Sequence, residues 1–144
     1  MRLEVGDVFR APPERVWAVL ADWEGQAAWM PDVAWMRLLG PDREMGARLA
    51  VRTRVLGVAT TTDLLLVTRW EPPRRLGVEH LGFVHGTGEW RLEPVPEGTR
   101  FTWVEELRLP FGMLGEIAIG VYGPIQRAML RRSVRNLRAI VEGS

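Results

Sequence analysis

The chain has 144 residues and a formal net charge of +1, a size typical of one domain with a single core. So small a net charge excludes the strong electrostatic field that favours binding to nucleic acid or to anionic membranes. The absence of Cys excludes disulfides, thiol nucleophiles and thiolate metal sites. No apolar run is long enough to span a membrane, and the N-terminal residues do not resemble a signal peptide. We therefore expect one cytoplasmic domain over residues 1–144, with no nucleic-acid partner.

The N-terminal part of the chain predicts a strand followed by a short helix. Residues 3–10 alternate apolar and polar side chains, as a strand does. Pro13 suits a first helical turn, and Glu14 suits the positive end of a helix dipole. Apolar side chains then recur at helical spacing over residues 16–23. Residues 26–32 allow one further helical turn, so we expect one or two short helices here.

The middle of the chain predicts six further strands joined by tight turns. These strands cover residues 33–39, 48–56, 60–70, 76–84, 86–95 and 100–109. Turn-forming residues separate the strands, and no helical pattern lies between them, which is typical of antiparallel hairpins. The sequence therefore predicts an antiparallel sheet of about six or seven strands.

Strand periodicity also predicts which side chains share a face of the sheet. Val51 and Thr53 alternate with arginines, so the apolar set is expected to face the core. Along the last strand, Trp103 and Glu105 are expected to lie on one face, towards the interior. An alternative for Glu105 is a β-bulge that turns its carboxylate outward. A second alternative is an ion pair with an arginine at the mouth of a cavity.

Residues 114–141 predict one long amphipathic helix, because their apolar side chains fall on one helical stripe. Pro124 lies inside this stripe and is expected to kink the helix or to split it into two pieces. A sheet of this size has one face that needs cover, and only this helix is long enough to cover it. We therefore predict an α+β fold in which a curved sheet wraps around the C-terminal helix and leaves an apolar cavity between them.

Three segments of the sequence resemble a known superfamily. They are APPERVWAVLADWEGQAAWMPDV at 11–33, WEPPRRL at 70–76, and GEWRLEP at 88–94 followed by GTRFTW at 98–103. In this order they resemble the START-like, polyketide cyclase/dehydrase superfamily, also called SRPBCC, whose members have the helix-grip fold. The superfamily includes lipid carriers, aromatase/cyclases, hormone receptors and chaperone-like regulators. The resemblance therefore implies a START-like ligand-binding domain but transfers no catalytic residue.

Alternation and the resemblance together predict the residues that line the cavity and bind its ligand. They are Trp35, Val51, Thr53, Leu66, His80, Trp90, Trp103, Glu105, Ile117, Val121 and Tyr122. Trp29 and Trp35 flank two methionines, and this cluster is interpreted either as a packed corner or as a gate at the cavity mouth.

Three of these residues are candidates for acid–base chemistry. A carboxylate facing an apolar cavity, as expected of Glu105, is typical of functional sites as well as of structural ion pairs. His80 lies in the middle of a strand, whereas His85 is expected in a turn exposed to solvent. Tyr122 is expected either to donate a hydrogen bond to a ligand or to satisfy a carbonyl that Pro124 leaves free. No spacing of His and carboxylates predicts a metal site.

The sequence thus favours a protein that binds a hydrophobic or amphipathic small molecule of the lipid, polyketide or quinone type, and it favours a binder over an enzyme. One alternative is a polyketide cyclase or aromatase that uses Glu105, His80 or Tyr122 as acid–base groups. Another is a non-enzymatic chaperone or regulator, of the quinone-binding or ribosome-associated kind that the resemblance implies. We expect no cofactor.

Overall fold

The computed structural model describes residues 1–55, 58–82, 85–108 and 112–143, but not the side chains of Val55, Thr60, Val121 and residues 112–119. The elements in chain order are β1 (Arg2–Phe9), α1 (Pro13–Leu20), the 3-10 helix η1 (Glu24–Ala28), β2 (Val33–Leu38), β3 (Arg48–Val55), β4 (Val58–Glu71), β5 (Arg75–Leu81), β6 (His85–Val95), β7 (Gly98–Arg108) and α2 (Gly112–Glu142).

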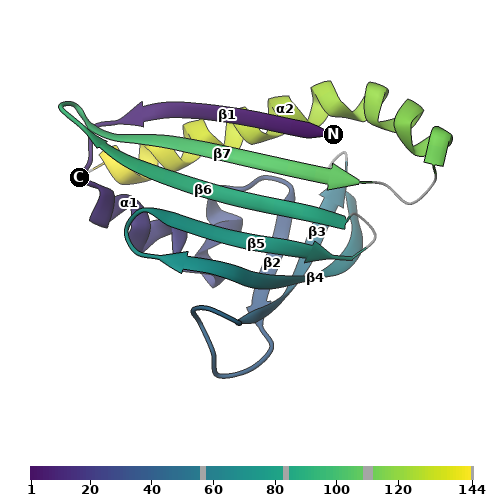
Figure 1. Cartoon of the computed structure of the whole chain (residues 1–144), viewed down its shortest axis with the longest axis horizontal. Coiled ribbons are helices and arrows are strands. Elements are labelled where there is room, and N and C mark those ends of the chain that lie inside the picture. The colour runs from purple at the N-terminus through teal and green to yellow at the C-terminus, as the bar shows by residue number, and fades with distance from the viewer. Residues whose placement is uncertain (56–57, 83–84, 109–111, 144) are drawn as a thin grey trace.

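The strands form one seven-stranded antiparallel sheet in the order β1-β7-β6-β5-β4-β3-β2. Figure 1 shows that β2 and β3 cross the direction of β1, β7 and β6 steeply, so the sheet curls. The helix α2 runs behind β1 along most of the length of that strand (Figure 1). The prediction of a curved sheet wrapped around a long C-terminal helix is therefore confirmed, with seven strands and two short helices after β1.

The first helix begins where the sequence predicts it. Pro12 is extended at the N-cap, Pro13 occupies the first helical position, and Glu14 lies in the first turn. The apolar side chains of α1, including Val16 and Leu20, are buried against the core. The short element η1 is the further helical turn expected over residues 26–32, although it begins earlier, at Glu24.

The helix α2 continues through Pro124 as a single element. Pro124 is exposed, so its ring lies in solvent while the turns on both sides stay helical. The prediction that Pro124 splits the helix is therefore wrong. No helix in the described part of the chain is both long and apolar enough to cross a membrane.

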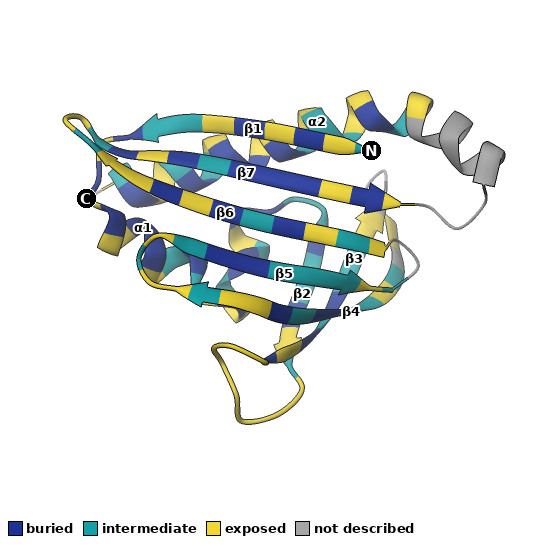
Figure 2. Cartoon of the chain, in the orientation of Figure 1, coloured by how far each residue is buried: buried dark blue, intermediate teal, exposed yellow. Residues whose placement is uncertain are grey.

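The apolar core fills one end of the space between the sheet and α2. The C-terminal half of α2 buries Leu130, Val134, Leu137 and Val141, a stripe with spacings of three and four residues. Figure 2 shows buried segments of α2 behind β1. Continuing the stripe towards the N-terminus of α2 brings the polar Gln126 to the inner face. Among the described side chains of α2, the buried apolar stripe is therefore followed by a polar residue that lines the space beside the core.

Candidate functional site

An internal cavity of about 450 Å³ lies between the concave face of the sheet and the middle of α2. Strands β2 to β7 all contribute to its wall, and α2 contributes Tyr122, Gln126 and Leu130. Seven of the residues that the sequence predicts for the wall lie on it, namely Val51, Thr53, His80, Trp90, Trp103, Glu105 and Tyr122. Cavities of this size are typical of small-molecule sites in proteins.

Two of the predicted lining residues lie elsewhere, and two are not described. Trp35 and Leu66 do not lie on the cavity wall. The side chains of Ile117 and Val121 lie outside the described residues, so their placement stays a prediction.

The position of Trp35 follows from an irregular strand. The pairing of β2 with β3 shifts register between Val33 and Trp35, so the side chains of β2 do not alternate regularly between the two faces of the sheet. Val33 and Met36 line the cavity, and Trp35 instead packs with Arg37, whose guanidinium carbon lies 4.2 Å from the centre of the indole ring. Residues two apart on a strand share a face, and for this pair it is the face away from the cavity.

Leu66 lies on the opposite face of β4 from the cavity. Its neighbour Leu65 lines the cavity and pairs with His80, and Leu66 pairs with Arg48 and Glu79. Successive side chains of a strand point to opposite faces, so an error of one residue exchanges the inner and outer sets. The sequence prediction made this error because Leu64, Leu65 and Leu66 are all apolar and conceal the alternation.

The predicted gate of Trp and Met residues does not form one cluster, because Trp35 lies on the outer face of the sheet and the other members lie inside. Met30 and Met36 line the cavity, as candidates for contact with a guest. Trp29 is only 1% exposed and packs its ring 5.6 Å from that of Trp90 and 6.1 Å from that of Trp103. The packed-corner alternative therefore describes Trp29, because a side chain this buried is part of the core.

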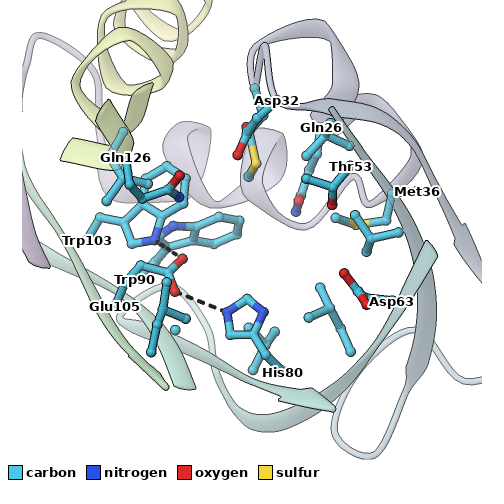
Figure 3. Close-up of a pocket in the computed structure, with 18 of the residues that line it drawn as sticks. Gln26, Asp32, Met36, Thr53, Asp63, His80, Trp90, Trp103, Glu105 and Gln126 are labelled. Carbon is cyan, nitrogen blue, oxygen red and sulfur yellow. Dashed lines mark hydrogen bonds and ion pairs between the residues drawn. The ribbon is translucent and has the colours of Figure 1, made fainter. Parts of the chain in front are cut away.

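A hydrogen-bonded chain of three side chains lies on the cavity wall. Glu105 is 7% exposed, and its Oε1 accepts a hydrogen bond of 3.0 Å from the indole Nε1 of Trp103. Its Oε2 lies 3.0 Å from the Nε2 of His80 (Figure 3). The strand pairing has no register shift at Glu105, so the β-bulge alternative is wrong. The partner of this carboxylate is a histidine rather than the arginine that the second alternative expected.

Gly88 makes this contact possible. Glu105 of β7 pairs directly with Gly88 of β6, and Gly88 pairs with Val78 of β5. A Cβ atom on Gly88 would lie only 3.3 Å from each carboxylate oxygen of Glu105. Because this position has no side chain, the carboxylate of Glu105 lies across β6 and reaches His80 two strands away.

The charge of Glu105 affects the protonation of His80. Burial alone would lower the pKa of His80, but the hydrogen bond to Glu105 and the charges of Glu105 and Asp63 outweigh this effect and raise it above 6.5. His80 therefore holds its proton more tightly in the folded state than in the unfolded state. This coupling stabilises the fold fully at pH values below about 6.5, and the stabilisation is lost as the pH rises through the folded-state pKa.

We expect a Glu105→Gln variant to lower the pKa of His80 below its ordinary value. The amide removes the nearest negative charge, whereas burial, the largest single effect, remains. The imidazole titration measured by NMR tests this, and wild-type stability relative to the variant should decrease as the pH rises. Glu106→Gln is the matched control, because Glu106 is exposed and pairs with Arg2. An unchanged His80 titration in Glu105→Gln would contradict the assigned coupling.

The family follows from comparison with known proteins. The family described as polyketide cyclase/dehydrase and lipid transport matches residues 2–142. The chain belongs to this family. A search of curated proteins finds no match.

Solved structures similar to this family member share its fold. The protein TTHA0849 from Thermus thermophilus is 18% identical, with a TM-score of 0.81 and coverage of 100% of both chains. The Zhui aromatase/cyclase from Streptomyces sp. R1128 is 20% identical, with a TM-score of 0.71 over 99% of this chain and 96% of that one. The di-domain aromatase/cyclase StfQ of the steffimycin biosynthetic pathway is 13% identical, with a TM-score of 0.81 over 98% of this chain and 50% of StfQ. At these identities the likeness establishes the fold alone.

The cavity of this polyketide cyclase/dehydrase family member contains polar residues that the sequence analysis missed. Asp32 and Asp63 line the wall, as do Gln26 and Gln126 (Figure 3). Asp63 is the single acid in the β-rich tract 58–70, and this was a usable signal, because Leu65 and Asp63 share a strand face. Asp32 lies between η1 and β2, where no periodicity predicts its direction.

Tyr122 lies on the cavity wall and is half-buried. Burial and, to a lesser extent, the charge of Asp32 raise the pKa of Tyr122 above 10, so its hydroxyl stays protonated at neutral pH. The other two acid–base candidates lie on the sheet, Glu105 on β7 and His80 on β5, whereas Tyr122 lies on α2. Within the described residues, no three His, Asp or Glu side chains are placed to hold a metal ion.

Proposed function

We propose that the chain binds a hydrophobic or amphipathic small molecule in the cavity between the sheet and α2. The observation that carries this proposal is a cavity of about 450 Å³ with a largely apolar wall and a few polar groups. Apolar surface removed from water contributes about 25 cal/mol per Å², so burying roughly 200 Å² of a ligand contributes roughly 5 kcal/mol. The polar groups would fix the orientation of the ligand. Membership of a polyketide cyclase/dehydrase and lipid transport family supports this reading.

Tryptophan fluorescence tests the proposal directly, because Trp23, Trp90 and Trp103 line the cavity. We expect saturable shifts on titration with members of a panel of lipids, aromatic polyketides and quinones. A Trp103→Phe variant should lose part of the response. A Trp35→Phe variant should keep the whole response, because Trp35 lies on the other face of the sheet. Flat titrations across the panel, together with no co-purified guest in native mass spectrometry, would overturn the proposal.

A second candidate function is acid–base catalysis on the bound molecule. The observation that favours it is the 3.0 Å contact between His80 and Glu105 on the cavity wall. In such a pair the imidazole transfers a proton to or from the substrate, and the carboxylate orients the imidazole and stabilises its charged form. We expect His80→Gln to abolish turnover of a linear poly-β-keto thioester while keeping its binding. Absence of turnover by the wild type would exclude this candidate and leave the binding proposal intact.

The remaining alternative, a non-enzymatic chaperone or regulator, would be favoured by a collapsed cavity and a contiguous apolar or basic patch on the outer surface. The cavity of about 450 Å³ does not favour this alternative.

A further inference from the structure

Negatively charged groups outnumber positively charged groups on the cavity wall. Three carboxylates line the wall, those of Asp32, Asp63 and Glu105, and Figure 3 shows them on different sides of the cavity. Among the described residues, His80 is the one lining side chain that can carry a positive charge. Met1 also lines the wall, and its ammonium group keeps its positive charge while it donates a hydrogen bond of 2.9 Å to the backbone carbonyl of Leu107, so three carboxylates face two groups that can be cationic. The side chains that are not described include no Arg, Lys or His, so they add no cation to this balance.

The imidazole of His80 can neutralise only one of these three carboxylates. Its Nε2 lies 3.0 Å from Glu105, so a protonated His80 compensates that group. Asp63 accepts a hydrogen bond of 3.1 Å from the hydroxyl of Thr61, and it lies against Gly82, where any side chain would collide with its carboxylate. The hydrogen bond from Thr61 stabilises the carboxylate, and the charge of Asp63 also helps to raise the pKa of His80.

The wall already disfavours further negative charge. Burial raises the pKa of Asp32, and the charge of Glu105 raises it further, although Asp32 lies between η1 and β2 and Glu105 lies on β7. A ligand with a carboxylate would add a fourth negative group to a space of low dielectric constant. A ligand with a positive charge would instead interact favourably with Asp32 and Asp63 together.

The aromatic part of the wall suits the same ligand. Trp90 and Trp103 line the cavity with their rings 5.5 Å apart and nearly perpendicular. The faces of indole rings attract cations, most strongly where water is excluded. The apolar wall, the aromatic rings and the surplus of carboxylates therefore all favour one chemistry.

We propose that the cavity selects an apolar molecule that carries a cationic nitrogen, such as a protonated amine, and discriminates against carboxylates such as fatty acids. This inference rests on the proposed binding function and specifies the class of ligand. Asp32 and Asp63 are the selecting groups, and Glu105 is compensated by His80.

The test uses three ligands with the same alkyl chain and different head groups. Decylamine, decanol and decanoate are titrated into the intact chain at neutral pH by calorimetry, below their aggregation concentrations. We expect decylamine to bind at least about tenfold more tightly than decanol, because a tenfold difference in affinity requires only a modest electrostatic gain. Decanoate should bind most weakly of the three. In a double variant, Asp32→Asn with Asp63→Asn, the advantage of decylamine over decanol should fall to less than about threefold.

Glu97→Gln is the matched control. Glu97 lies exposed in the turn between β6 and β7, so this substitution removes one carboxylate that does not line the cavity. It should keep the full preference for the amine. Decanoate binding as tightly as decylamine overturns the inference but leaves the proposed function standing, as does an unchanged amine preference in the double variant. Absence of binding by all three ligands overturns both.

Discussion

A Gly88→Val variant is expected to lose more than about tenfold in ligand affinity while it keeps its fold. A Cβ at this position would lie 3.3 Å from both carboxylate oxygens of Glu105, and the two methyl groups of valine need still more room. The carboxylate must therefore move away from His80, and the added groups occupy part of the cavity. Valine is well suited to a strand, so the sheet itself should tolerate the change. Calorimetric titration and thermal unfolding measure the two effects separately.

Gly40→Val is the control for this experiment. A Cβ on Gly40 has no atom within 4 Å, and the residue is exposed in the turn after β2. This variant should bind ligand as the wild type does. Gly88→Ala should give an intermediate loss, since it introduces the Cβ without the two methyl groups. Wild-type affinity in Gly88→Val would show that the Glu105–His80 contact and the space beside it do not matter for binding.

Phe101→Ala is expected to lower the free energy of unfolding by about 3–5 kcal/mol, the range for truncation of a large buried aromatic side chain. Phe101 is fully buried, with 0% exposure, and its ring stacks on that of Phe9 with 5.4 Å between centroids. Small domains have a total stability of about 5–15 kcal/mol, so this loss is a large fraction of it. Urea denaturation of the two proteins measures the difference.

The comparison for Phe101 is an exposed neighbour on the same strand. Arg100 forms an ion pair of 3.6 Å with Glu93, and both side chains are more than half exposed. An exposed pair of this kind contributes less than about 1 kcal/mol, so Arg100→Ala should change the unfolding curve little. Equal destabilisation by the two substitutions would contradict the placement of Phe101 in the closed end of the core.

The fold was predictable because several strands keep an unbroken alternation. In β3 and β7 every second residue faces inward, so Val51, Thr53, Trp103 and Glu105 were placed correctly from the sequence. The two errors arise where the pattern is interrupted or concealed. A register shift in β2 moved Trp35 outward, and a run of three leucines in β4 hid the face of Leu66.

The contacts across the cavity were not predictable, because they join residues that are distant in the sequence. His80 and Glu105 are 25 residues apart, and their contact depends on which strands are neighbours and on their register. The absence of a side chain at Gly88 was the one local signal, and it gains meaning only once Gly88 is known to pair with Glu105. Asp32 lines the cavity from the connection between η1 and β2. No strand or helix period applies there, so the sequence pattern does not predict the direction of its side chain.

The pairing of β1 with β7 bears on how the chain folds during synthesis. Every other strand pairs with the strand next to it in the sequence, but Leu3 pairs with Glu105 and Phe9 with Thr99. Hairpins between sequence neighbours form early, because closing a short loop costs little entropy. During synthesis β1 therefore lacks its strand partner until β7 follows it, and α2, which packs against β1, is made later still. Until then, the apolar side chains of β1 lack the cover that β7 and α2 give them in the folded chain.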